Sequence, residues 1–128
     1  MIFANQAELD GCVVKWQKIL RLQDWDIRAK IAATTRELGI DPPDAMVNVN
    51  HKRRCATILL NPEPGAHKDI WPVDQEQNVV HELVHIFTEP FWPEDKGEDS
   101  CKWMLAEQCV DSLANALIAL DRRTIKPA

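Results

Sequence analysis

Residues 79–87 run Val79-Val80-His81-Glu82-Leu83-Val84-His85-Ile86-Phe87. On a helix, two histidines four residues apart project from one face, so both can ligate a single metal ion. Neutral imidazoles suit zinc, and the adjacent Glu82 can act as general base on a metal-bound water without being a ligand itself. The pattern therefore predicts a helix that carries a metal site.

The alternative is a chance match on a surface helix whose histidines are solvated. The flanking residues oppose it, because they are apolar and predict a helix buried nearly all round: Val79, Val80, Leu83, Val84, Ile86 and Phe87. Two histidines and a glutamate in such a helix need partners that compensate for their burial. We therefore favour metal ligation by His81 and His85.

Signals for both ends of this helix are present. Asp74, followed three residues later by Gln77, matches a capping box that starts a helix. Pro90 disfavours the helical conformation of the residue before it and so ends the helix. The motif helix is therefore expected over residues 74–89.

The chain before the motif helix predicts one helix and three strands. Apolar residues at helical spacing indicate a helix over residues 5–22, and strict alternation over 24–31 indicates a half-buried strand. Residues 45–49 and 55–60 are two further strand candidates, separated by a turn, and predict a hairpin. We expect an extended peptide to pair with residues 56–61 as an edge strand.

The chain after the motif helix predicts a loop and a second long helix. Residues 91–99 are polar and acidic, and Asp99 or Ser100 can cap a helix that runs to about residue 120. Residues 121–128 are expected to be a frayed tail. The fold expected for residues 1–128 is one α+β domain with an N-terminal helix, a mostly antiparallel sheet of three strands or more, the motif helix and a long C-terminal helix.

Composition narrows the class of protein. A chain of 128 residues, 45% apolar and 27% charged, is long enough for one globular domain. Its apolar runs are too short to span a bilayer, and its first residues lack the pattern of a signal peptide, so we expect a cytoplasmic protein. The net charge of -5 opposes nucleic-acid binding, and the basic residues 51–54 are expected to form a solvated turn. The four cysteines form no Cys-x-x-Cys pair and are expected to be reduced and mostly buried.

Two imidazoles alone would hold zinc loosely, so the motif predicts a third ligand from elsewhere in the fold. No histidine follows His85, which leaves carboxylates and thiols as candidates: Glu89, Glu94, Asp95, Glu98, Asp99, Glu107, Asp111, Cys101 and Cys109. At about 100° per residue, Glu107 falls within the apolar arc of the last helix and Asp111 falls at its edge. Buried there, Glu107 is explained as a metal ligand and Asp111 as an acceptor for a histidine N–H. We favour these two, and the other candidates stay open.

Together, His81-Glu82-Leu83-Val84-His85 and Glu107-Gln108-Cys109-Val110-Asp111 resemble the paired signature of the gluzincin metallopeptidases. The order of elements is similar to the minimal zincin-like peptidases common in phages and prophages. The resemblance implies that His81, His85 and Glu107 bind zinc, that Glu82 is the catalytic base, and that Asp111 orients a histidine.

The resulting expectation is a zinc-dependent hydrolase, most plausibly a peptidase acting on a peptide or protein substrate. Trp71 and Trp92 are expected to be either a substrate wall or loop anchors. The family usually supplies a tyrosine or histidine that stabilises the oxyanion, but this chain has no tyrosine and offers only His51, His67, Arg53 and Arg54. A regulatory or interaction module that keeps zinc for stability is therefore the alternative, and a metal-free domain with packed histidines is a third. The oligomeric state is not predicted.

Overall fold

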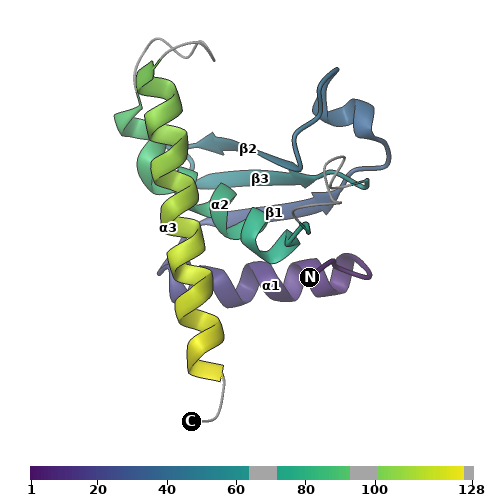
Figure 1. Cartoon of the computed structure of the whole chain (residues 1–128), viewed down its shortest axis with the longest axis horizontal. Coiled ribbons are helices and arrows are strands. Elements are labelled where there is room, and N and C mark those ends of the chain that lie inside the picture. The colour runs from purple at the N-terminus through teal and green to yellow at the C-terminus, as the bar shows by residue number, and fades with distance from the viewer. Residues whose placement is uncertain (64–71, 93–100, 126–128) are drawn as a thin grey trace.

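Every helix and strand predicted from the sequence is present among residues 1–63, 72–92 and 101–125, which the computed structural model describes (Figure 1). The elements are α1 (Gln6–Ile19), β1 (Asp26–Ile31), the 3-10 helix η1 (Thr35–Leu38), β2 (Ala45–Asn50), β3 (Cys55–Leu60), α2 (Gln75–Thr88), the 3-10 helix η2 (Glu89–Phe91) and α3 (Cys101–Ile125). The predicted α+β class is confirmed. The expected cap of α3 at Asp99 or Ser100 lies outside the described residues.

The sheet has the strand order β1-β3-β2. β2 and β3 form the predicted antiparallel hairpin, in which Ala45 lies opposite Leu60. β1 runs parallel to β3, so the sheet is mixed, and the expectation of a mostly antiparallel sheet holds only for the hairpin. Because β3 is paired on both sides, the expected edge strand at residues 56–61 is wrong. The edge strands of this sheet are β1 and β2.

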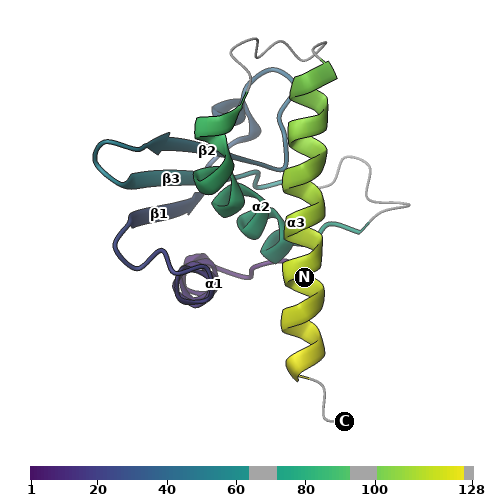
Figure 2. The same cartoon turned by 90° about the vertical axis from the view of Figure 1, so that its left-hand side faces the viewer.

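The helices pack in layers against the sheet. Figure 2 shows α1 end-on beside β1, and α2 between the sheet and α3. The core joins these layers through side chains with almost no exposure, including Trp16 of α1, Ile58 of β3, Leu83 of α2 and Val110 of α3. Burial of α2 is less complete than its sequence suggested, because Phe87 on its outer side is 47% exposed.

α3 is longer than predicted, because it continues through residues 121–125, which were expected to be a frayed tail. Ion pairs hold this last part of the helix to the rest of the molecule. Asp121 lies 2.7 Å from the ammonium group of Lys15 on α1. Arg122 pairs with Asp74, the N-cap of α2, at 2.6 Å and with Glu76 at 3.2 Å.

The buried carboxylate of Glu76 joins three helices. It accepts hydrogen bonds from Trp16 Nε1 at 2.9 Å and from Lys15 Nζ at 3.0 Å, both on α1, in addition to its contact with Arg122 on α3. Burial alone would raise the pKa of Glu76, but these donors outweigh burial and lower it. Glu76 is therefore ionised at neutral pH and fixes the first turn of α2 to both neighbouring helices.

All four cysteines are free, as predicted. The expectation that they are mostly buried is wrong, since Cys101 and Cys109 are exposed on α3 and only Cys12 is buried. Their positions follow from the helix period, which turns residues 101 and 109 away from the arc that packs on α2.

None of the described helices is both long enough and apolar enough to cross a membrane. α3 has 25 residues, which is sufficient length, but polar and charged side chains occur along it.

Candidate metal centre

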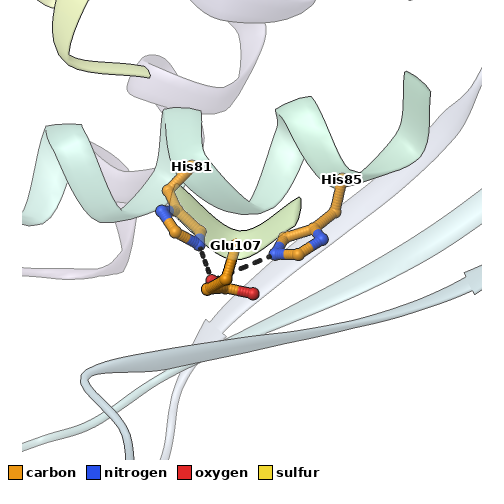
Figure 3. A group of neighbouring side chains, drawn as sticks. All are labelled: His81, His85 and Glu107. Carbon is orange, nitrogen blue, oxygen red and sulfur yellow. Dashed lines mark hydrogen bonds and ion pairs between the residues drawn. The ribbon is translucent and has the colours of Figure 1, made fainter. Parts of the chain in front are cut away.

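His81 and His85 of α2 and Glu107 of α3 converge on one point (Figure 3). Nε2 of His81 lies 2.6 Å from Oε1 of Glu107, and Nε2 of His85 lies 3.6 Å from the same oxygen. Ligand atoms around a tetrahedral zinc ion, each about 2.0–2.1 Å from the metal, are about 3.4 Å apart. One ligand atom from each of the three residues lies within 4.8 Å of the others, so small side-chain movements suffice for this group to hold a metal ion.

Local sequence explains why the two histidines point the same way. Asp74 caps α2 as predicted, since its side chain accepts a hydrogen bond from the backbone N–H of Gln77. From there the apolar side of α2 is buried in the core through Val79, Val80, Leu83 and Ile86. The helix period then turns His81 and His85 toward α3, where their side chains are 16% and 13% exposed.

Asp111 contacts His81 at Nδ1, whereas Glu107 contacts the same ring at Nε2. The Oδ1 of Asp111 lies 3.3 Å from Nδ1 of His81, an arrangement in which the ring N–H donates to the carboxylate and leaves Nε2 free for a metal. Asp111 was expected to lie at the edge of the buried arc, and its side chain is 54% exposed. The predicted contact is nevertheless present.

Gln77 was recognised only as part of a capping box, although it has a second role. Its Nε2 donates to Oδ1 of Asp111 at 3.1 Å and to Oδ1 of Asn115 at 3.2 Å. Gln77 therefore holds Asp111 in position beside His81. The signal was available in the sequence, because residues 77, 81 and 85 are spaced by four and share one helix face.

The two histidines stabilise the ionised form of Glu107. Their hydrogen bonds lower the pKa of Glu107 to about 2. Burial alone would lower the pKa of His81, but the hydrogen bond to Glu107 and the nearby carboxylates outweigh burial and raise it. Because a metal ion binds only the neutral imidazole, protons and metal compete for His81.

Glu82 is buried on the same helix, and burial raises its pKa. It lines a cavity of about 470 Å³ together with His85 and Glu107. Glu82 is not part of the group of three that can hold a metal ion. A carboxylate with a raised pKa beside such a group is placed to take up a proton from a molecule in the cavity.

Two tryptophans form one wall of this cavity. Trp92 packs on His85, with ring centroids 5.0 Å apart, and on Trp103 of α3 at 5.8 Å. Its Nε1 donates to Thr88 Oγ1 at 3.2 Å, which fixes the ring. Residues 45–47 of β2 also line the cavity. Trp103 and these β2 residues were not predicted, since only the fold brings them to the motif helix.

Several residues considered from the sequence are not part of the metal-holding group. Glu89 lines the cavity but is not in the metal-holding group, and the exposed Cys101 and Cys109 are not in it either. The basic residues 51–54 form the predicted hairpin turn and do not line the cavity. Six further candidates fall outside the described residues: His67, Trp71, Glu94, Asp95, Glu98 and Asp99.

No family model matches this chain, and no curated protein or solved structure is significantly similar to it.

Proposed function

We propose that the protein is a zinc-dependent hydrolase and most plausibly a peptidase. The observation that carries the proposal is that His81, His85 and Glu107 converge from two helices while Glu82 lines the same cavity without joining their group. Two imidazoles and one carboxylate form a donor set that suits zinc and leaves a coordination position for water or substrate. A purely structural zinc site is usually closed by four protein ligands.

Each residue has a distinct task in the proposed reaction. Zinc held by this group would supply Lewis acidity, which lowers the pKa of water and polarises a carbonyl group. Glu82 accepts the proton of the attacking water at its carboxylate and returns it to the leaving amine. Asp111 keeps the ring of His81 in the tautomer whose Nε2 faces the metal position. Gln77 holds Asp111 in place.

The free edge of β2 offers a place for an extended peptide. The N–H of Asn61 donates to the C=O of Asp44, so the main-chain groups of Asp44 point toward the β3 side. Because antiparallel partners alternate, the main-chain groups of Ala45 and Val47 point to the other side, where β2 has no neighbour in the described sheet. Both residues line the cavity, so a peptide paired with them would pass beside Glu82 and the metal ligands.

The walls of the cavity favour a large apolar side chain next to the scissile bond. Trp92, Trp103, Ala45 and Val47 all line the cavity, and such apolar surfaces gain most from contact with aromatic or aliphatic groups. The carboxylate of Glu89 also lines the cavity and disfavours acidic side chains. We expect unstructured peptides with phenylalanine or leucine to be better substrates than peptides with aspartate.

The test compares zinc-loaded protein with the Glu82→Gln variant on an unstructured fluorogenic peptide. The variant is expected to keep its zinc and lose most of its turnover, because glutamine cannot accept the proton. Metal content is measured on both proteins, purified without an affinity tag. Equal cleavage by the two proteins, with equal zinc content, would refute the role of Glu82 and with it the proposed mechanism.

A second candidate is a regulatory or interaction module that retains zinc for stability. An oxyanion formed during hydrolysis needs a hydrogen-bond donor or a cation to stabilise it. The sequence contains no tyrosine, and the described cavity lining contains no arginine, lysine or tyrosine, which favours this second candidate. Chelation separates the two candidates. Loss of thermal stability on chelation, in a protein that cleaved nothing when loaded with zinc, supports the module.

A further inference from the structure

A second cavity lies beside the metal centre and has a different chemical character. Its volume is about 490 Å³. It shares no described lining residue with the cavity of Glu82 and His85, so the two cavities are distinct. Most of the described residues that line it are polar or charged, and six of them carry the argument: Asp44, Asp74, Gln77, Asn78, Asp111 and Arg122.

The second cavity continues the first one along the same elements. On α2 the lining passes from Glu82 to Asn78, and on α3 from Glu107 to Asp111. Each step is four residues, which is about one helical turn or 5.4 Å. On the strand side the lining passes from β2 to Asp44, the residue just before that strand. An extended peptide that pairs with the edge of β2 would therefore reach both cavities.

The charge of the second cavity is negative. Asp44, Asp74 and Asp111 supply three carboxylates, and Arg122 is the one cation among the described lining residues, so the formal charge is -2. Arg122 lies 2.6 Å from Asp74 and 3.2 Å from the buried Glu76, so its charge is directed at these two partners. The carboxylates of Asp44 and Asp111 remain to attract a cation, and the side chain of Asp111 is 54% exposed.

The second cavity suits an organic cation better than a second metal ion. Within the described residues, the group close enough to hold a metal ion is His81, His85 and Glu107. The three carboxylates of the second cavity do not converge in this way. An ammonium or guanidinium group has several N–H donors and can contact separate carboxylates with them.

Asn78 adds a hydrogen-bond donor that has no partner. Its Nδ2 is buried and makes no hydrogen bond in the described part of the chain. An unpaired buried donor is rare in folded proteins and needs an explanation. Rotation of the amide about its last torsion, which is soft, would bring Nδ2 to the cavity that Asn78 lines. A peptide carbonyl in the cavity could then accept the bond.

We propose that the second cavity is a substrate subsite for lysine or arginine, next to the apolar subsite at Trp92 and Trp103. This inference rests on the proposed function. In an extended peptide, side chains on the same side recur every second residue, about 6.6 Å apart, which is close to the turn of about 5.4 Å between the two cavities. The basic side chain is therefore expected two positions from the apolar one, with its cation near Asp44 and Asp111.

The first test measures binding without turnover. The zinc-loaded Glu82→Gln variant is titrated into fluorescein-labelled peptides that carry one phenylalanine and, two positions before or after it, either lysine or norleucine. Norleucine keeps the aliphatic chain but lacks the charge. For one of the two placements we expect the lysine peptide to bind about fivefold more tightly than the norleucine peptide. This preference should fall below about twofold in about 0.5 M salt, because salt screens the ion pairs.

A matched pair of variants locates the preference. Asp44→Asn, made in the same Glu82→Gln background, should reduce the preference for lysine to about twofold or less, because one carboxylate is lost. Asp41→Asn is the control, since it removes the same charge from an exposed position three residues earlier that does not line the cavity. It should keep the full preference. Circular dichroism checks that both variants are folded.

The second test measures cleavage of the same peptides by the zinc-loaded parent protein. A preference for lysine in binding, without any cleavage by the parent, would refute the proposed hydrolysis and still support a cation site in the second cavity. Cleavage with no preference for lysine at either placement would overturn the subsite and leave the proposed function standing. Equal binding of lysine and norleucine peptides, no binding of either, or a preference that Asp44→Asn leaves unchanged would each overturn the subsite as well.

Discussion

Replacing Glu107 and Asp111 separately tests the proposed zinc site most sharply, because their proposed roles lead to different losses of zinc affinity. Glu107 contributes the carboxylate among three metal-holding side chains, and glutamine in its place offers only a neutral oxygen. Asp111 acts through His81, and changing a residue that orients a ligand typically costs 10–100-fold in metal affinity. Its 3.3 Å contact and 54% exposed side chain place Asp111 at the low end of that range.

We therefore expect Asp111→Asn to weaken zinc binding about tenfold, which corresponds to about 1.4 kcal/mol. Glu107→Gln is expected to weaken it by at least about 100-fold, or about 2.7 kcal/mol, because a ligand is worth more than the residue that orients one. The assay is competition between the protein and a chromogenic zinc chelator near neutral pH. Glu89→Gln is the control, since Glu89 lines the cavity but is not in the metal-holding group, and it should bind zinc like the parent.

Two results would refute this reasoning. Unchanged zinc affinity in Glu107→Gln would mean that the carboxylate is not a ligand. A larger loss in Asp111→Asn than in Glu107→Gln would mean that the two carboxylates have exchanged roles, with the metal on the outer side of His81.

Three further predictions concern stability, each measured by urea unfolding. Glu76→Gln should destabilise the fold by about 2 kcal/mol, because Lys15 and Arg122 each lose one of their two carboxylate partners, while glutamine can still accept from Trp16. The lowered pKa of Glu76 means that its contribution is fully present above its unfolded pKa and is lost as the pH falls through the folded value, so the variant should lose less stability on acidification than the parent. Leu83→Ala should cost about 3 kcal/mol, because Leu83 is fully buried, and a cost below about 1 kcal/mol would contradict its place in the core. Asn5→Ala should cost about 1 kcal/mol, because the Asn5 side chain caps α1 by accepting from the backbone N–H of Glu8.

The parts of the molecule that follow from local spacing were predictable. The helix period places His81 and His85 on one face, and the same period turns Glu107 inward on the last helix. Asp74 is the N-cap of α2, and the alternation of β1 is the burial pattern observed. Each of these features depends on residues only a few positions apart, so the local sequence is sufficient to predict it.

The parts that depend on distant residues were missed. Strand alternation specifies which side of a strand is buried but not its neighbours, so the parallel pairing of β1 with β3 could not be foreseen. The buried Glu76 looked like any glutamate in a first helical turn until Arg122 and Lys15 were placed beside it. The same contacts explain why α3 extends to Ile125.

The three metal-holding side chains come from two helices, so a bound ion would link α2 to α3 and affect the stability of the fold in a cell. An ion held by His85 and Glu107 would close a loop of 22 residues, since 107 minus 85 is 22. Because the ligands come together only in the folded chain, a bound ion would stabilise the fold by mass action, by about 2.7 kcal/mol when the free metal concentration is about 100 times the dissociation constant. That is a large share of the stability of a small domain. If zinc is the ion, as proposed, zinc starvation would raise the unfolded fraction and expose the chain to proteolysis, so the abundance of the protein would follow the supply of metal.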